Sequence, residues 1–252
     1  LTDGKCFIVG NSEKHIRETL WPKLAKAGAF RIIKDEETKQ WRVWHPNESN
    51  DLARKKFSKP APPLIPPRFI QSIAWKSRKM AIPNVVKLNT GWEMSFFTAG
   101  TKPPKGVAVH IAWFDEEVED EDWYPEIAAR LLDFGGLFIW SATPEAGTQQ
   151  LWELSERAAV QEKMEKPVTK EFYTHIDDNI FLPQKEKDIF IAKIGYDPEV
   201  LKVKLGGEFA LGLSKVFHEF NSAAQGRASP VAFLGSRSRP PTPWLGPCPP
   251  VR

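Results

Sequence analysis

The chain has 252 residues, of which 41% are hydrophobic, and a formal net charge of +3. A chain of this length can bury a core, so we expect one medium-sized domain with an appendage. No apolar run approaches the roughly 20 residues needed to cross a bilayer, which argues against a membrane-spanning helix. Cys6 and Cys248 lie at opposite ends without metal-ligand spacing, and they favour a reducing compartment.

Predicted strands and helices alternate along most of the chain. Apolar or alternating patterns predict strands at 5–9, 30–34, 40–44, 85–88, 93–98, 107–114 and 136–140. A helix capped by Asn11 or Ser12 should run to about residue 27, and another should span 123–133. A further helix is expected from Pro144 to about residue 163, with Thr143 as its N-cap. Near-continuous apolar strands separated by helices predict an α/β fold, with a mostly parallel sheet flanked by helices.

Basic residues are concentrated between positions 52 and 92, where the sequence has nine Lys or Arg residues and no acid. Phe57, Phe69 and Trp75 lie in the same segment. Cations next to aromatic side chains can follow a phosphate backbone and stack on bases. The alternative is a solvated basic face with a few core aromatics. The candidate DNA-binding residues are Lys55, Lys56, Lys76, Arg78 and Lys79.

The apolar run 107–114 ends on three adjacent acids, Asp115, Glu116 and Glu117. A magnesium nucleotide needs one carboxylate at the carboxyl end of a strand, to hold the metal or its waters. A second carboxylate can orient and deprotonate the attacking water. We interpret Asp115 as the metal-associated acid and Glu116 as the base, with Glu117 as the alternative base one position along. The competing interpretation is the acidic first turn of a helix.

A second motif follows the apolar run 136–140, which ends on Ser141, Ala142, Thr143 and Pro144. The two hydroxyl groups could sense the γ-phosphate of a bound nucleotide. The alternative is a plain helix cap, which needs no nucleotide.

The order of these motifs resembles a known family. Gly106, IAWFDEE at 111–117, WYPEIAARL at 123–131 and GGLFIWSATPEAG at 135–147 resemble the ATPase core of the large terminase subunit of tailed bacteriophages. PPRFIQSIAWKSRKM at 66–80 and KLNTGWEMSFFTAG at 87–100 resemble the insertion and hairpin before the acidic strand. IDDN at 176–179 and LGGEFALGLSKVFHEF at 205–220 resemble the segment between motor and nuclease. The resemblance covers roughly residues 4 to 221.

The resemblance implies a P-loop NTPase-like core of the RecA/terminase type that uses ATP and Mg²⁺. It implies that Asp115 is the magnesium-associated acid, that Glu116 is the catalytic base, and that Ser141, Ala142 and Thr143 couple the state of ATP to DNA movement. Arg130 is a candidate phosphate sensor, although an ion pair with Glu126 four residues earlier is an equal alternative. The implied partners are double-stranded DNA, the portal protein, the small terminase subunit and further copies in a homo-oligomeric ring. The implied location is the cytoplasm of the bacterial host, not the mature virion.

Two family features are missing from the sequence. It has no GxxxxGK[ST] phosphate loop, and no acid cluster of a nuclease domain follows Phe220. We therefore expect the middle fragment of a terminase, incomplete at its N-terminus and inactive alone. The expected parts are an ATPase core at 1–157, a lid or linker at 158–221, and a disordered, proline-rich tail at 222–252, whose abrupt start suggests a truncated or out-of-frame end.

Other interpretations stay open. The chain could be a helicase-like ATPase fragment, a non-catalytic DNA-binding protein or a relic. We interpret His110 as a core or edge histidine. For His175, beside Asp177 and Asp178, a polar loop is favoured over a metal site.

Overall fold

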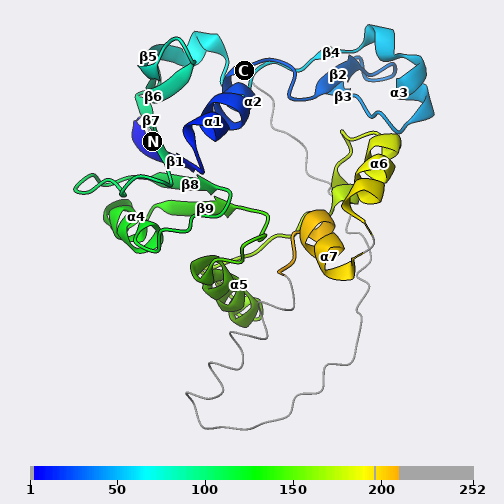
Figure 1. Cartoon of the computed structure of the whole chain (residues 1–252). Coiled ribbons are helices and arrows are strands. Elements are labelled where there is room, and N and C mark those ends of the chain that lie inside the picture. Colours follow the sequence, from blue (N-terminus) through cyan, green and yellow to red (C-terminus); the bar gives the residue numbers. More distant parts are fainter. Residues whose placement is uncertain (1–2, 196, 210–252) are drawn as a thin grey trace. The chain divides into compact units, whose positions relative to one another are not determined.

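The computed structural model describes residues 3–195 and 197–209 (Figure 1). The chain divides into two compact units, residues 1–214 and 215–252, and the second lies outside the described residues. The expected tail and the last part of the expected linker therefore fall outside the described part of the chain. None of the described helices is long and apolar enough to cross a membrane.

The main sheet has six strands in the order β5-β6-β7-β1-β8-β9. Its four parallel members are β7 (Trp92–Thr98), β1 (Gly4–Gly10), β8 (Ile111–Asp115) and β9 (Leu137–Ser141). At one edge, β5 (Ile70–Ser77) and β6 (Ile82–Leu88) pair in antiparallel fashion. The expected α/β fold with a mostly parallel sheet is confirmed. The strand β5 was not predicted, because its segment was interpreted as a basic insertion.

One face of this sheet is covered by the helical segment that follows β1. It consists of α1 (Glu13–His15), a π-helical turn η1 (Ile16–Leu20) and α2 (Trp21–Ala25). Pro22 has no N–H to donate, and the N–H of Trp21 bonds to the carbonyl of Ile16 five residues back. The segment ends at Ala25, two residues before the predicted end. Its apolar side chains pack on β1, β6 and β7 in a cluster of Ile8, Ile16, Leu20, Trp21, Ile82, Val86, Met94 and Phe96.

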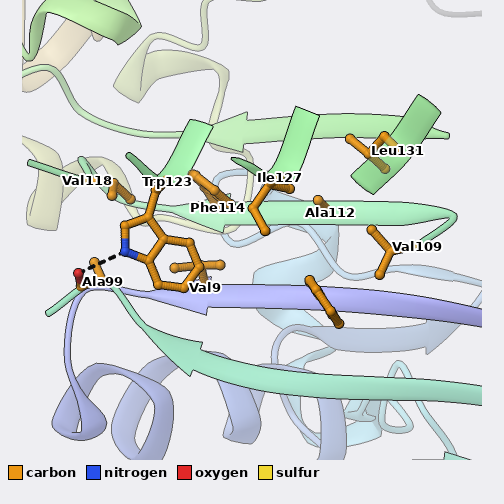
Figure 2. Close-up of a cluster of buried hydrophobic side chains, with 10 residues drawn as sticks. Val9, Ala99, Val109, Ala112, Phe114, Val118, Trp123, Ile127 and Leu131 are labelled. Atoms are coloured by element: carbon orange, nitrogen blue, oxygen red, sulfur yellow. Dashed lines mark hydrogen bonds between the residues drawn. The ribbon is translucent and has the colours of Figure 1, made fainter. Parts of the chain in front are cut away.

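The other face of the sheet is covered by α4 (Trp123–Leu131), which continues into the 3₁₀ turn η4 (Leu132–Phe134). Figure 2 shows Trp123, Ile127 and Leu131 of α4 packed against Val9 and Phe114 of the sheet. The Trp123 indole Nε1–H donates to the carbonyls of Ala99 (3.1 Å) and Thr101 (2.9 Å). These bonds satisfy the buried indole and join α4 to the loop after β7.

The predicted strand at 107–114 is too long at its start, because β8 begins only at Ile111. The N–H of Val109 bonds to Arg130 O and the N–H of His110 bonds to Lys5 O. Apolar character alone therefore misplaced the boundary, since Val109 is buried against α4 without being in the strand.

A second, three-stranded antiparallel sheet has the order β3-β2-β4. Its strands are β2 (Arg31–Lys34), β3 (Trp41–Val43) and β4 (Lys59–Pro60), with α3 (Ser49–Ala53) and the 3₁₀ turns η2 (Lys55–Phe57) and η3 (Pro67–Phe69) between elements. Asp51 of α3 is fully buried and accepts two hydrogen bonds from the Arg42 guanidinium, both at 2.7 Å. The Arg42–Asp51 ion pair fastens α3 to the small sheet.

The remaining elements are α5 (Gln149–Gln161), the 3₁₀ turn η5 (Ile176–Asp178), α6 (Gln184–Ile194) and α7 (Pro198–Gly206). The helix α5 runs through position 157, where the core was expected to end. It begins at Gln149 with Thr148 as its N-cap residue. The prediction of Thr143 as N-cap and Pro144 as first helical residue is therefore wrong.

Candidate functional site

The carboxyl ends of β1 and β8 form a topological switch point. The helical segment after β1 lies on one face of the sheet, and α4 after β8 lies on the opposite face. The chain also places β7 on one side of β1 and β8 on the other. Ligands of open α/β sheets bind in the crevice that such a reversal leaves outside the carboxyl ends of the strands. The switch point is therefore the candidate site.

Four residues form a row across the carboxyl ends of the parallel strands. Thr98 of β7 is in register with Gly10 of β1, Gly10 with Asp115 of β8, and Asp115 with Ser141 of β9. The sequence predicted that Asp115 and Ser141 would end strands, and the pairing of β8 with β9 brings them side by side.

The Asp115 carboxylate is held from two sides. Its Oδ1 accepts a hydrogen bond from Ser141 Oγ (2.6 Å), and its Oδ2 lies 3.0 Å from His15 Nε2. The Asp115 and His15 side chains are only 16% and 13% exposed. Because each carboxylate oxygen has a polar partner, the orientation of the Asp115 side chain is fixed. A fixed orientation is what a group that binds a ligand needs.

His15 completes the site and was not among the sequence candidates. Its Nδ1 accepts the N–H of Asn11 (3.2 Å), so the proton of the neutral imidazole is on Nε2, toward Asp115. Its own N–H bonds to Ser12 Oγ (3.1 Å), as predicted for a helix capped by Ser12. The available signal was its position in the first helical turn after a predicted strand.

Ser141 is a positioning group and not an activated nucleophile. Its hydroxyl donates to Asp115 and accepts the indole N–H of Trp113 (2.9 Å). In a Ser–His–Asp triad the imidazole lies between the other two groups and takes the serine proton. Here the carboxylate lies between serine and histidine, so the arrangement fixes Asp115.

The two glutamates after Asp115 have different environments. Glu116 has a left-handed backbone (φ 73°), with its N–H bonded to Ser141 O (2.7 Å) and its carbonyl accepting from Trp140 Nε1 (2.9 Å). Its side chain is exposed at the carboxyl edge of the sheet. A non-glycine residue in this region costs roughly 1–3 kcal/mol, and such residues are frequent at functional sites.

Glu117 is instead a structural residue. Its carboxylate accepts the backbone N–H groups of Ala146 (2.6 Å) and Thr148 (3.0 Å). It thereby holds the loop between β9 and α5. These bonds leave Glu116, and not Glu117, with its carboxylate toward solvent.

The other two residues of the proposed coupling motif lie in this loop. Ala142 and Thr143 are half-buried, and Thr143 O accepts the N–H of Glu145 (2.8 Å). Glu145 also forms an ion pair with Lys204 of α7. The motif is therefore connected to Asp115 through Ser141, and to α7 through Glu145.

Arg130 lies away from the site. It is in the last turn of α4, where its carbonyl bonds to the N–H of Val109, just before the amino end of β8. Asp115 is at the other end of that strand, about 13 Å from Ile111 at 3.3 Å per residue. The Arg130 guanidinium is paired with Glu126. The structure thus favours the ion-pair alternative over a phosphate sensor.

The candidate DNA-binding cations lie in two separate parts of the fold, one beside the small sheet and one at the edge of the main sheet. Lys55 and Lys56 are in η2 beside the small sheet, while the others are at the end of β5 and in the turn to β6. All five are exposed: Lys55, Lys56, Lys76, Arg78 and Lys79. Lys76 forms an ion pair with Glu13 (2.7 Å).

The three aromatic residues of the basic segment differ in exposure. Trp75 packs edge-on against Trp21 in the core, which removes it as a stacking residue. Phe57 is 61% exposed and Phe69 is 38% exposed.

The two histidines discussed from the sequence have structural roles. His110 Nδ1 accepts the N–H of Lys5 (3.1 Å), and its ring stacks on Phe134. His175 caps η5 through bonds with Asp177 and Asp178. Within the described ranges, no group of three or more His, Cys, Asp or Glu residues could hold a metal ion.

The donor set at Asp115 fits a magnesium ion only as part of a nucleotide complex. Asp115 and Ser141 supply one carboxylate and one hydroxyl, and Mg²⁺ commonly takes one or two carboxylates with phosphate oxygens and waters.

Comparisons with family models, curated proteins and solved structures found no match.

Proposed function

We propose that this chain forms the acidic-strand part of an ATP-driven motor core of the terminase type, which packages double-stranded DNA. The observation that carries the proposal is the register of Gly10, Asp115 and Ser141 at a topological switch point. This is where an α/β sheet binds ligands, and it holds an oriented carboxylate.

The roles follow from the contacts. Asp115, fixed by His15 and Ser141, would hold Mg²⁺ or its waters on ATP. Glu116, exposed one residue further, would orient and deprotonate the attacking water. The magnesium ion, when bound, supplies charge stabilisation to the phosphates. Ser141, Ala142 and Thr143 would pass a change at Asp115 to α7 through the loop that contains Glu145.

The sequence contains no GxxxxGK[ST] loop, so the proposal requires the main phosphate contacts to come from another polypeptide segment. The portal protein, the small terminase subunit and a homo-oligomeric ring belong to the same proposal. For this chain alone we therefore expect weak nucleotide binding, in the millimolar range, and no rapid turnover.

The test is equilibrium binding of a fluorescent ATP analogue with and without Mg²⁺, on the wild type and Asp115→Asn. We expect binding that depends on Mg²⁺ and is at least tenfold weaker in Asp115→Asn. Lys166→Gln, a change at an exposed lysine between α5 and η5, is the control and should bind as the wild type does. Equal binding by wild type and Asp115→Asn, or binding indifferent to Mg²⁺, would exclude this use of Asp115.

A second candidate is a non-catalytic DNA-binding protein, favoured by the exposure of the five candidate cations. Under this proposal, charge reversal at Lys55, Lys76 and Lys79 abolishes DNA retention, while Asp115→Asn leaves it unchanged. DNA retention that survives the charge reversal would exclude it.

A further inference from the structure

One face of the small sheet is open and combines an indole with two lysines. Antiparallel pairing places Lys34 opposite Trp41, and Ile32 opposite both Val43 and Lys59. Residues directly opposite in an antiparallel pair share a face, and so do residues two apart in one strand. These five side chains therefore form one surface, which we call the Trp41 face. The opposite face carries Arg42, whose partner Asp51 comes from α3.

The polar and aromatic groups of the Trp41 face are accessible. Trp41 is 50% exposed, and Lys34 and Lys59 are exposed. The Lys59 Nζ lies 3.8 Å from the centroid of the Trp41 ring. Because Lys59 and Trp41 are on the two outer strands, the lysine side chain crosses the central strand β2 to reach the indole. The Lys59 ammonium group thus covers one side of the indole plane, so a base stacks on the other side of the ring or displaces the lysine toward its own phosphate.

Nearby negative charge is largely neutralised by partners. Two of the three acids in the turn between β2 and β3 are paired, Asp35 with Arg42 (3.2 Å) and Glu36 with Arg54 (3.2 Å). The third, Glu37, is exposed, as is Lys39 in the same turn. Lys55 and Lys56 in η2, just before β4, add two exposed cations. The charge of the surface is therefore complementary to a phosphate backbone.

We propose that the Trp41 face binds single-stranded nucleic acid, with one base stacked on Trp41 and the phosphates next to Lys34 and Lys59. An indole stacks on the face of a base, and inside a duplex both faces are covered by neighbouring base pairs, so a duplex would use the lysines alone. The proposal does not depend on nucleotide binding at Asp115. It also uses an aromatic residue outside the basic segment identified in the sequence.

The experiment measures the affinity of the full chain for a fluorescently labelled oligothymidine at several salt concentrations. Trp41→Ala should weaken binding about five- to tenfold, because base stacking is lost. Trp41→Phe should retain most of the affinity. Lys34→Gln and Lys59→Gln should each make the slope of log K against log salt shallower by about 0.7. Lys166→Gln, which removes the same charge elsewhere, should leave that slope unchanged.

Thermal melting confirms that each variant is folded. If Trp41→Ala fails to fold, the salt dependence of binding by Lys34→Gln and Lys59→Gln still tests the proposal. An unchanged affinity in a folded Trp41→Ala, or unchanged slopes in both lysine variants, would overturn the proposal. A duplex of the same length that binds as tightly as the single strand would also overturn it, and would indicate recognition of phosphates alone.

Discussion

The imidazole of His15 lies 3.0 Å from the carboxylate of Asp115, although the two residues are far apart in the chain. The contact exists because β1 and β8 are adjacent parallel strands, and each residue lies at or just after the carboxyl end of its strand. Ser141 binds the other carboxylate oxygen from the next strand. Three elements therefore determine the orientation of one acid.

His15→Ala should lower the free energy of unfolding by about 1 kcal/mol, because Asp115 loses a hydrogen bond at a largely buried position. Urea unfolding followed by tryptophan fluorescence measures the change. The matched variant His175→Ala removes a half-exposed histidine that caps a 3₁₀ turn, and should cost less. Equal losses in both variants would contradict a specific role for the His15 contact.

Glu116 and Glu117 provide a matched pair of neighbouring acids. Glu117→Ala should destabilise the loop between β9 and α5 by about 1–3 kcal/mol, because two backbone N–H groups lose a charged acceptor. Glu116→Ala should leave stability within about 0.5 kcal/mol of the wild type, since its side chain is exposed. Hydrogen exchange of Ala146 and Thr148 measures the difference. Faster exchange in the Glu116 variant alone would reverse the assignment.

Asp51→Asn should destabilise the small sheet by about 3 kcal/mol, at the lower end of the range for a broken buried ion pair. The lower value is expected because the Arg42 side chain is 35% exposed and also contacts Asp35. Exchange protection of β2 and β3 should fall, while that of β1 and β8 should not. Uniform loss across both sheets would show that the two sheets unfold together.

Acid should destabilise the small sheet only once the pH falls below 3.8, the ordinary pKa of an aspartate. Hydrogen bonds from Arg42 lower the pKa of Asp51, and bonds led by the Thr38 backbone N–H lower the pKa of Asp35 from 3.8 to about 2. Since both carboxyls bind protons more weakly when folded, their stabilising effect is complete above pH 4. It is lost as the pH falls from about 4 toward 2. Circular dichroism across this range should show a weaker pH dependence in Asp51→Asn than in the wild type.

Gly136, just before β9, is a position where an added methyl group would meet backbone and core atoms. An added Cβ would lie 2.6 Å from His110 O and 2.7 Å from Leu131 Cδ2. Gly136→Ala should therefore lower stability by about 1–3 kcal/mol through overpacking. Gly100→Ala, where no atom lies within 4 Å of the added group, is the control and should be near neutral. Thermal melts of the two variants give the comparison, and a stable Gly136→Ala would contradict the close packing of β8, α4 and β9.

The sequence alone determined the α/β class and the strand ends at Asp115 and Ser141. Apolar runs that stop on polar residues depend on local pattern, and local pattern is readable without the fold. Local apolar pattern could not show where β8 begins. Val109 is as apolar as a strand residue, but its N–H bonds to the carbonyl of Arg130 in α4 and not to a neighbouring strand. It also missed β5 and placed the start of α5 five residues early.

Only the tertiary structure decided which acids and cations are available for a ligand. Glu117 differs from Glu116 because its carboxylate reaches a loop that follows another strand, which no local pattern encodes. Arg130 is separated from Asp115 by the length of β8, and Trp75 is partly buried against Trp21. His15 joins the site because strand order brings two distant segments to one sheet edge. Strand order and register depend on packing between segments that are remote in the chain, so the sequence could supply Asp115 and Ser141 but neither His15 nor the arrangement of the three.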